Sequence, residues 1–291
     1  MPALHRPGSL DEAATLLSTL DNPMVYGGGT AIQILVKQGI LFADNFVDLA
    51  TVPGLRDIAV DASGVTVGPM VSLRRMETDE RVRATAPLAA AAYHQVANPR
   101  VRNTASAGGN LAHGDYRLDP PTALLVLGAI VRATSVRGTR DIPVREFFTD
   151  FQQTALEPDE LVSGIRIPSQ PAGSAGRFVK SSSLGENDWP CASAAVLVAG
   201  RTVHIGLGAV APTPRYVSFD ATGMDDQQAV DAALEVVEPE LDPIPDVRGG
   251  AGYKRRLARV TVEDAVRAAW KDPAWRDTAW RDTAWKDTGN A

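Results

Sequence analysis

Residues 24–31 read Met-Val-Tyr-Gly-Gly-Gly-Thr-Ala, and this stretch decides the fold of the N-terminal part of the chain. The apolar residues 24–26 are typical of a short strand, and a helix is predicted from Ala31 to about Gly39. Glycines between a strand and a helix let the backbone approach a phosphate closely. The stretch matches neither G-x-G-x-x-G nor G-x-x-x-x-G-K-[ST], so these two nucleotide-binding fingerprints do not apply. A tight turn that only glycine can form stays open as the alternative.

A second glycine-rich stretch, residues 104–113, reads Thr-Ala-Ser-Ala-Gly-Gly-Asn-Leu-Ala-His. We expect it to be a loop between helices, with small residues and several hydrogen-bond donors. Asp115 and Asp119 follow it, and their carboxylates can accept hydrogen bonds from ribose or ribityl hydroxyls. A surface Ω-loop is the alternative. Two such clusters in one chain favour a bound dinucleotide more strongly than either does alone.

The remaining patterns predict an α+β protein with a break near residue 172. The segment 169–176 is rich in Ser, Pro and Gly and is the best candidate for a linker. Predicted helices cover the residues after the capping residue Ser9, then 31–39, 73–78, 84–98, 121–127, 226–237 and 262–270. Predicted strands cover 24–26, 46–49, a hairpin over 58–67, 130–135, 140–143, 162–167, 177–182, 192–199 and 203–210.

Composition excludes several classes of protein. The chain has 291 residues, of which 44% are hydrophobic and 22% charged, as in globular proteins with a sizeable core. Its net charge of -6 argues against nucleic-acid binding. The single cysteine, Cys191, excludes a disulfide framework and thiolate-ligated zinc or iron–sulfur sites within this chain. The longest strongly apolar run, residues 120–131, is too short to span a bilayer, and we expect a cytoplasmic protein.

Five ordered blocks of sequence resemble the medium, FAD-carrying subunit of molybdenum hydroxylases of the carbon monoxide dehydrogenase and xanthine dehydrogenase type. The two glycine clusters are similar to the FAD-binding loops of that family. Residues 147–168 are similar to the end of its FAD domain, and residues 206–214 and 252–258 to its C-terminal domain. The resemblance covers about residues 1–270.

The resemblance implies a fold and its division into domains. It implies a two-subdomain FAD-binding fold of the vanillyl-alcohol-oxidase type in residues 1–57 and 58–170, with the flavin between the subdomains. It further implies a C-terminal flavoprotein domain in residues 175–270, built from a three-stranded sheet and helices. A tail, residues 271–291, remains.

The resemblance also implies roles for individual residues. The glycine clusters would bind the pyrophosphate, Asp119 the flavin chain, and Leu161 the cofactor through its backbone. Lys180 would lie near the flavin ring, where its charge favours the reduced anion, and Trp189 of the Asp188-Trp189 pair would cover one ring face. For Trp189, a plain core aromatic is the alternative. The full set of predicted FAD-binding residues is Tyr26, Gly27, Gly28, Gly29, Thr30, Ala31, Thr104, Ser106, Ala107, Gly108, Gly109, Asn110, His113, Asp115, Asp119, Leu161, Lys180 and Trp189. No catalytic residue and no metal ligand is predicted, and Tyr26 stands where the family usually carries a small residue.

The implied function is that of an electron-transfer subunit in a dimer of heterotrimers. Electrons would pass from the [2Fe–2S] clusters of a small iron–sulfur subunit through FAD to an external acceptor, while a large molybdopterin subunit oxidises the substrate. Quinone, NAD and oxygen stay open as acceptors, and carbon monoxide, N-heterocycles, purines and aldehydes as substrates. Peripheral association with a membrane through the complex is also left open. The alternatives are a free-standing FAD oxidoreductase and a flavin-free scaffold subunit.

The C-terminus carries an unusual repeat. Trp270, Trp275, Trp280 and Trp285 recur every five residues. A period of five matches neither a helix nor a strand, so we expect a repeat-expanded, disordered tail. A peptide that docks on an electron acceptor or a membrane factor is the alternative, since tryptophans are frequent anchors at interfaces.

Overall fold

The computed structural model describes residues 2–185 and 187–272, so most of the predicted tryptophan tail lies outside the described residues. The chain forms two compact units that interleave along the sequence. Unit 1 comprises Met1–Ala86, Val96–Asp115 and Gly128–Ser169, and unit 2 comprises Pro87–Gln95, Tyr116–Leu127 and Gln170–Ala291. Both units mix helices with sheets, which confirms the α+β prediction. Among the described residues, no helix is both long enough and apolar enough to cross a bilayer.

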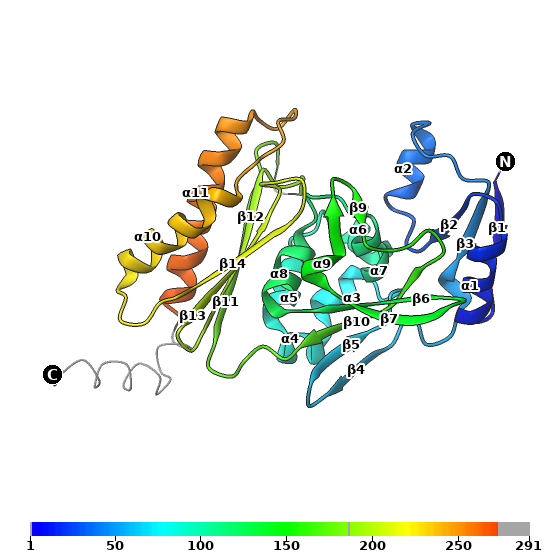
Figure 1. Ribbon diagram of the computed structural model, residues 1–291, viewed down its shortest axis with the longest axis horizontal. Helices are drawn as coiled ribbons and strands as arrows, with labels where there is room; N and C mark the ends of the chain where they lie inside the picture. Colours follow the sequence, from blue (N-terminus) through cyan, green and yellow to red (C-terminus); the bar gives the residue numbers. More distant parts are fainter. Residues whose placement is uncertain (1, 186, 273–291) are drawn as a thin grey trace. The chain divides into compact units, whose positions relative to one another are not determined.

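Unit 1 begins with a small parallel sheet (Figure 1). Its strand order is β1 (Ala3–His5), β3 (Asn45–Asp48), β2 (Pro23–Tyr26). Helix α1 (Leu10–Thr19) packs its apolar face on this sheet, and the Ser9 hydroxyl caps it by accepting a hydrogen bond from the Glu12 amide, as predicted. Helix α2 (Ile32–Lys37) follows the first glycine cluster, and the 3-10 turn η1 (Leu49–Thr51) follows β3.

The second sheet of unit 1 is antiparallel and has five strands. Their order is β4 (Ile58–Asp61), β5 (Gly64–Val67), β10 (Leu161–Pro168), β6 (Ile130–Ser135), β7 (Gly138–Pro143). The pairing of β4 with β5 confirms the predicted hairpin. Unit 1 also holds the helices α3 (Leu73–Thr78), α4 (Glu80–Thr85), α6 (Pro99–Thr104), α7 (Ala107–Ala112) and α9 (Val144–Phe147), and the short pair β8 (Phe148–Asp150) and β9 (Gln153–Thr154).

Two of the predictions for residues 84–119 are wrong. The predicted helix over 84–98 is divided, because α4 ends at Thr85 and a new helix, α5 (Pro87–His94), starts at a proline. Proline disfavours helical geometry in the residue before it, and Ala86 has a φ of -139°. The predicted loop over 104–113 holds α7, which starts at the capping residue Ser106, and α6 ends at its first residue after starting at the capping residue Asn98.

Unit 2 is built on an antiparallel sheet of four strands, not the three that the resemblance implied. The order is β11 (Ala175–Ser181), β12 (Ala192–Ala199), β13 (Thr202–Gly208), β14 (Arg215–Asp220). The fourth strand pairs with β13 over residues 215–220.

Helices cover both faces of this sheet. Alternate residues of β12 and β13 form a core with α10 (Asp226–Val237) and α11 (Ala251–Trp270), which the turn η2 (Glu238–Glu240) separates. On the other face, α8 (Asp119–Leu127) lies so close that a Cβ at Gly206 would be 2.1 Å from the Thr122 carbonyl oxygen. Helix α5 contacts β11 and α8 as well. Unit 2 therefore takes two of its helices from the N-terminal half of the chain.

Candidate functional site

The two glycine clusters meet in unit 1. The Gly28 amide donates a hydrogen bond to the Ser106 hydroxyl over 3.3 Å. A Cβ at Gly28 would lie 2.1 Å from the Thr104 carbonyl oxygen and 2.7 Å from the Ala105 Cα. Because backbone fills that space, only glycine permits the contact. Two stretches almost 80 residues apart thus form one cradle, as the binding of a single ligand by both would require.

The second cluster is a helix start rather than the predicted loop. Ser106 caps α7, and its hydroxyl also accepts from the Gly109 amide at 3.3 Å. Gly108 packs on Pro69, since a Cβ at this position would lie 2.5 Å from the proline Cβ. Ala107 and Gly108 are buried inside this helix, and His113 is its C-terminal capping residue.

Asn110 carries a polar atom that fits a ligand. Its side-chain Oδ1 is buried and has no hydrogen-bond partner within the described part of the chain. A buried acceptor without a partner costs about 1–3 kcal/mol, and such groups in folded proteins call for an explanation. A hydroxyl or N–H group of a ligand would satisfy it.

The Tyr26 side chain packs against the glycine cradle. Gly29 has a φ of +72°, and a Cβ there would lie 2.2 Å from the Tyr26 hydroxyl. The same hydroxyl accepts a hydrogen bond from Gln33 Nε2 over 2.6 Å. The cradle therefore tolerates a large residue where the family usually has a small one. Thr30 and Ala31 lead from this turn into α2.

Two other predicted residues of unit 1 lie deeper. Asp115 is 1% exposed and accepts from Gln152 Nε2 over 3.4 Å. Leu161 begins β10, and its side chain packs in the core with Val47 and Leu49. A ligand contact by Leu161 would therefore have to use its backbone, as the resemblance implies.

In unit 2, Asp119 and Lys180 form a buried ion pair. Lys180 Nζ donates to Asp119 Oδ2 and to the Gln95 carbonyl oxygen, each over 2.9 Å, and both charged side chains are 4% exposed. Burial raises the pKa of Asp119 to about 6, although the Lys180 ammonium acts in the opposite direction. Asp119 Oδ1 has no hydrogen-bond partner among the described residues. The pair thus presents an unused acceptor, as a site for a hydroxyl-bearing ligand would.

A cavity of about 380 Å³ adjoins this pair. It is lined by Gln95, Lys180, Ser182, Ser183, Leu184 and Gly185. The buried hydroxyl of Ser182 has no hydrogen-bond partner within residues 2–185 and 187–272. Gln95 was missed by the sequence analysis because it takes part through its backbone carbonyl, which leaves no signal in the residue type.

Trp189 is half-buried and does not belong to the core of unit 2. The guanidinium carbon of Arg117 lies 4.7 Å from the centroid of its ring, within the range of a cation–π contact. Trp189 is therefore not part of that core, and part of its side chain is exposed.

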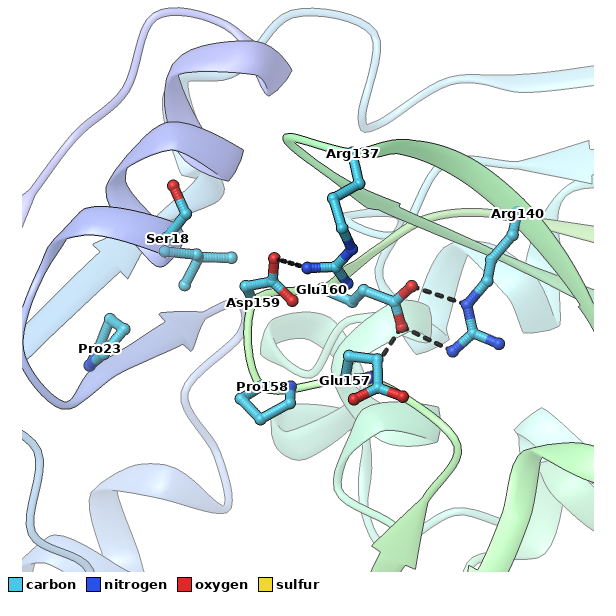
Figure 2. Close-up of a pocket in the computed structure, with 9 residues that line it drawn as sticks. Ser18, Pro23, Arg137, Arg140, Glu157, Pro158, Asp159 and Glu160 are labelled. Atoms are coloured by element: carbon cyan, nitrogen blue, oxygen red, sulfur yellow. Dashed lines mark hydrogen bonds and ion pairs between the residues drawn. The ribbon is translucent and has the colours of Figure 1, made fainter.

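A larger groove of about 770 Å³ lies elsewhere in unit 1 (Figure 2). It is lined by Leu17, Ser18, Pro23, Arg137, Arg140, Glu157, Pro158, Asp159 and Glu160. Its arginines are paired with carboxylates, Arg137 with Asp159 and Arg140 with Glu160. Pro23 begins β2, whereas the glycine cradle follows the other end of that strand. The groove contains none of the predicted cofactor-binding residues, and we assign it no ligand. Among the described residues, no cluster of side chains suits a metal ion.

Comparison with known proteins gives consistent results. A family model for the FAD binding domain in molybdopterin dehydrogenase matches residues 2–170. The chain is 31% identical over 280 residues to the carbon monoxide dehydrogenase medium chain of Hydrogenophaga pseudoflava, covering 91% of this chain and 96% of that one. It is 30% identical over 279 residues to the nicotine 6-hydroxylase medium subunit of Paenarthrobacter nicotinovorans, covering 91% and 97%. Among solved structures, a chain of the reconstituted CO dehydrogenase from Oligotropha carboxidovorans superposes with a TM-score of 0.87 at 29% identity, covering 92% of this chain and 97% of that one.

Proposed function

This chain belongs to the FAD-binding medium subunits of the molybdenum hydroxylases, and on that premise we propose that it binds FAD and passes electrons from a partner subunit to an external acceptor. The contact of Gly28 with Thr104 and Ser106 carries the proposal, because it joins the two family motifs into one cradle. The buried, unpartnered Asn110 Oδ1 of the second glycine cluster supports a ligand that donates a hydrogen bond there, as a hydroxyl group of FAD can.

Bound FAD would supply the redox chemistry, since it accepts and donates one or two electrons. In unit 1, the backbone amides of Gly29 and Thr30 and the side chains of Thr30 and Asn110 would hold the pyrophosphate. The amides of residues 107–110 already donate to oxygens of the protein. The close approach that the glycines allow is what such a contact needs.

In unit 2, we assign Asp119, Lys180 and Trp189 to the flavin end of FAD. The Lys180 ammonium is buried and held in place by Asp119 and the Gln95 carbonyl. A buried cation favours negative charge on a neighbouring ring, which would raise the tendency of the flavin to accept electrons. Asp119 Oδ1 would accept a hydrogen bond from a hydroxyl of the flavin chain.

We further propose two partner subunits, a small one with [2Fe–2S] clusters and a large one with molybdopterin, in a dimer of heterotrimers in the cytoplasm. The single cysteine supports this division, because a thiolate-ligated cluster needs several cysteines.

Helix α2 and the residues after it also expose apolar side chains, Ile34, Val36, Ile40 and Phe42, at 39–77%. Exposed apolar patches of this kind are typical of surfaces that contact another protein. The large subunit would set the substrate, because chains from a CO dehydrogenase and from a quinoline 2-oxidoreductase both share this chain's fold.

The test is the flavin content of the complex purified from its native host. We expect about one FAD per copy of this chain, together with iron–sulfur absorption from the partners. In Gly28→Ala the added methyl group would push the two loops apart, so FAD should be lost. Gly250→Ala is the matched control, because nothing lies within 4 Å of its Cβ position.

Each other outcome counts against part of the proposal. FAD without partners would favour a free-standing oxidoreductase. An intact complex that contains no flavin would favour a scaffold subunit. If Gly28→Ala bound FAD with wild-type affinity, the glycine cradle would not be part of the FAD site.

A further inference from the structure

The Asp188-Trp189 pair is held by a residue 60 positions further along the chain. Arg248 Nε donates to Asp188 Oδ2 over 2.9 Å, and its Nη2 donates to Oδ1 over 2.7 Å. This two-point contact fixes the carboxylate in orientation as well as in distance. The two side chains are only 13% and 21% exposed, so the pair is partly shielded from solvent. Arg248 lowers the pKa of Asp188, which keeps the carboxylate ionised.

Arg248 itself lies in a turn that backbone hydrogen bonds close. The backbones of Asp246 and Gly249 exchange two hydrogen bonds of 3.1 Å, which closes the turn at its base. The Asp246 carboxylate accepts from the Arg248 amide over 2.8 Å. The ring of Tyr253 packs on Gly249, where a Cβ would lie 2.5 Å from it.

Lys254 of α11 holds this turn in place. Its side chain is fully buried, and Nζ donates to Asp246 Oδ1 and to the Ile244 carbonyl oxygen, each over 2.8 Å. A buried ammonium needs such partners, because an unpaired buried charge costs several kcal/mol. Ser183, which lines the cavity beside Lys180, donates to the Arg248 carbonyl oxygen over 3.0 Å. The chain of contacts therefore runs from α11 through Asp246 and Arg248 to Asp188.

Arg117 covers one face of the Trp189 ring. The indole is thus held at its backbone by the Asp188 contact and at one ring face by a guanidinium. A flavin stacked on this indole would therefore use the opposite ring face.

We propose that Arg248 is a positioning residue for Trp189, holding the Asp188-Trp189 segment so that the indole presents this second face to the flavin. The inference rests on the proposed function for its purpose, but the hold of Arg248 on Trp189 is measurable without FAD. Residues 252–258, which lie far from the glycine loops in sequence, then support the turn that carries Arg248.

The test uses the full chain and a cycle of variants. Flavin emission per bound FAD reports on stacking against Trp189, so Trp189→Phe should raise it. We expect Arg248→Gln to raise it to a similar level and the double variant to show no further rise. Arg248→Lys, which keeps one charged contact, should recover part of the quenching. Arg259→Gln is the matched control, because Arg259 also pairs with a carboxylate, Glu238, but lies on the exposed side of α11.

A second readout needs no FAD. In chain labelled with 5-fluorotryptophan, the fluorine resonance of Trp189 is identified by its loss in Trp189→Phe. Arg248→Gln should shift or broaden it, and Arg259→Gln should leave it unchanged. If Arg248→Gln does not fold, Asp188→Asn breaks the same contact and should give the same changes.

The outcomes separate the two proposals. Wild-type emission and an unchanged Trp189 resonance in Arg248→Gln would overturn the inference, as would additive effects in the double variant. A wild-type chain that binds no FAD would overturn the proposed function, and the shift of the Trp189 resonance would still decide whether Arg248 holds the indole.

Discussion

At the scale of single residues, burial and the Lys180 charge shift the pKa of Asp119 in opposite directions. Burial raises the pKa of its carboxyl group from the ordinary value of 3.8 to about 6, despite the ion pair with Lys180. Between these two pH values the folded protein holds more protons than the unfolded chain. The stability that this group contributes is therefore present below about pH 4 and is lost as the pH rises through about 6.

We expect this effect in a comparison of wild type with Asp119→Asn. The free energy of unfolding of wild type minus that of the variant should fall by on the order of 3 kcal/mol as the pH rises from about 4 to about 7. Denaturant titrations at a series of pH values measure it.

The control for this prediction is Asp141→Asn. Arg132 lowers the pKa of Asp141, so its contribution has the opposite sign and is lost as the pH falls. The same free-energy difference should then rise with pH, or stay flat because the pair is exposed. A rise with pH for Asp119→Asn would contradict the raised pKa.

At the scale of elements, two helices both start at a serine cap, but the two caps make different further contacts. Ser9 caps α1 by accepting from the Glu12 amide over 3.1 Å. Ser106 caps α7 and in addition accepts from Gly28 of the first glycine cluster. Loss of a serine cap costs about 1 kcal/mol in either case.

The two serine caps should have similar effects on stability but different effects on FAD binding. Ser9→Ala and Ser106→Ala should lower the free energy of unfolding by similar amounts, about 1 kcal/mol each. Only Ser106→Ala should weaken FAD binding, because only its hydroxyl also ties the two glycine loops together. Denaturation and flavin titration of both variants are the measurements, and equal loss of FAD in the two would speak against a cradle made by both loops.

At the scale of the whole molecule, the interleaving of the units limits where the chain can be divided. The sheet of unit 2 is covered on one face by α5 and α8, which come from residues 87–95 and 116–127. A fragment that starts near residue 170 lacks both helices and exposes that face to water.

We therefore expect the fragment 170–272 to bind a dye for exposed apolar surface and to unfold without cooperativity. A chain that joins residues 87–95 and 116–127 to 170–272 through short linkers should bind less dye and unfold cooperatively. A well-folded 170–272 fragment would instead support the division into domains near residue 172 that the sequence predicts.

The amino-acid sequence alone was enough for features whose cause lies within a few residues. The cap of α1, the hairpin over 58–67 and the helices Leu73–Thr78 and Asp226–Val237 follow from local capping, alternation and periodicity. The glycine clusters and the blocks around them also placed the chain in its family. Where local signals competed, as at Pro87 and at the short capped helices after Asn98, the sequence predictions were wrong.

Only the tertiary structure decided which distant residues meet. It joins Gly28 to Ser106, Lys180 to Asp119 and Arg248 to Asp188, across 78, 61 and 60 positions. It also gives α5 and α8 to unit 2 and adds a fourth strand to its sheet. The physical reason is that periodicity and capping act over one or two turns of chain. Contacts between buried charges and between backbones depend on the path of the whole chain, which a local pattern does not contain.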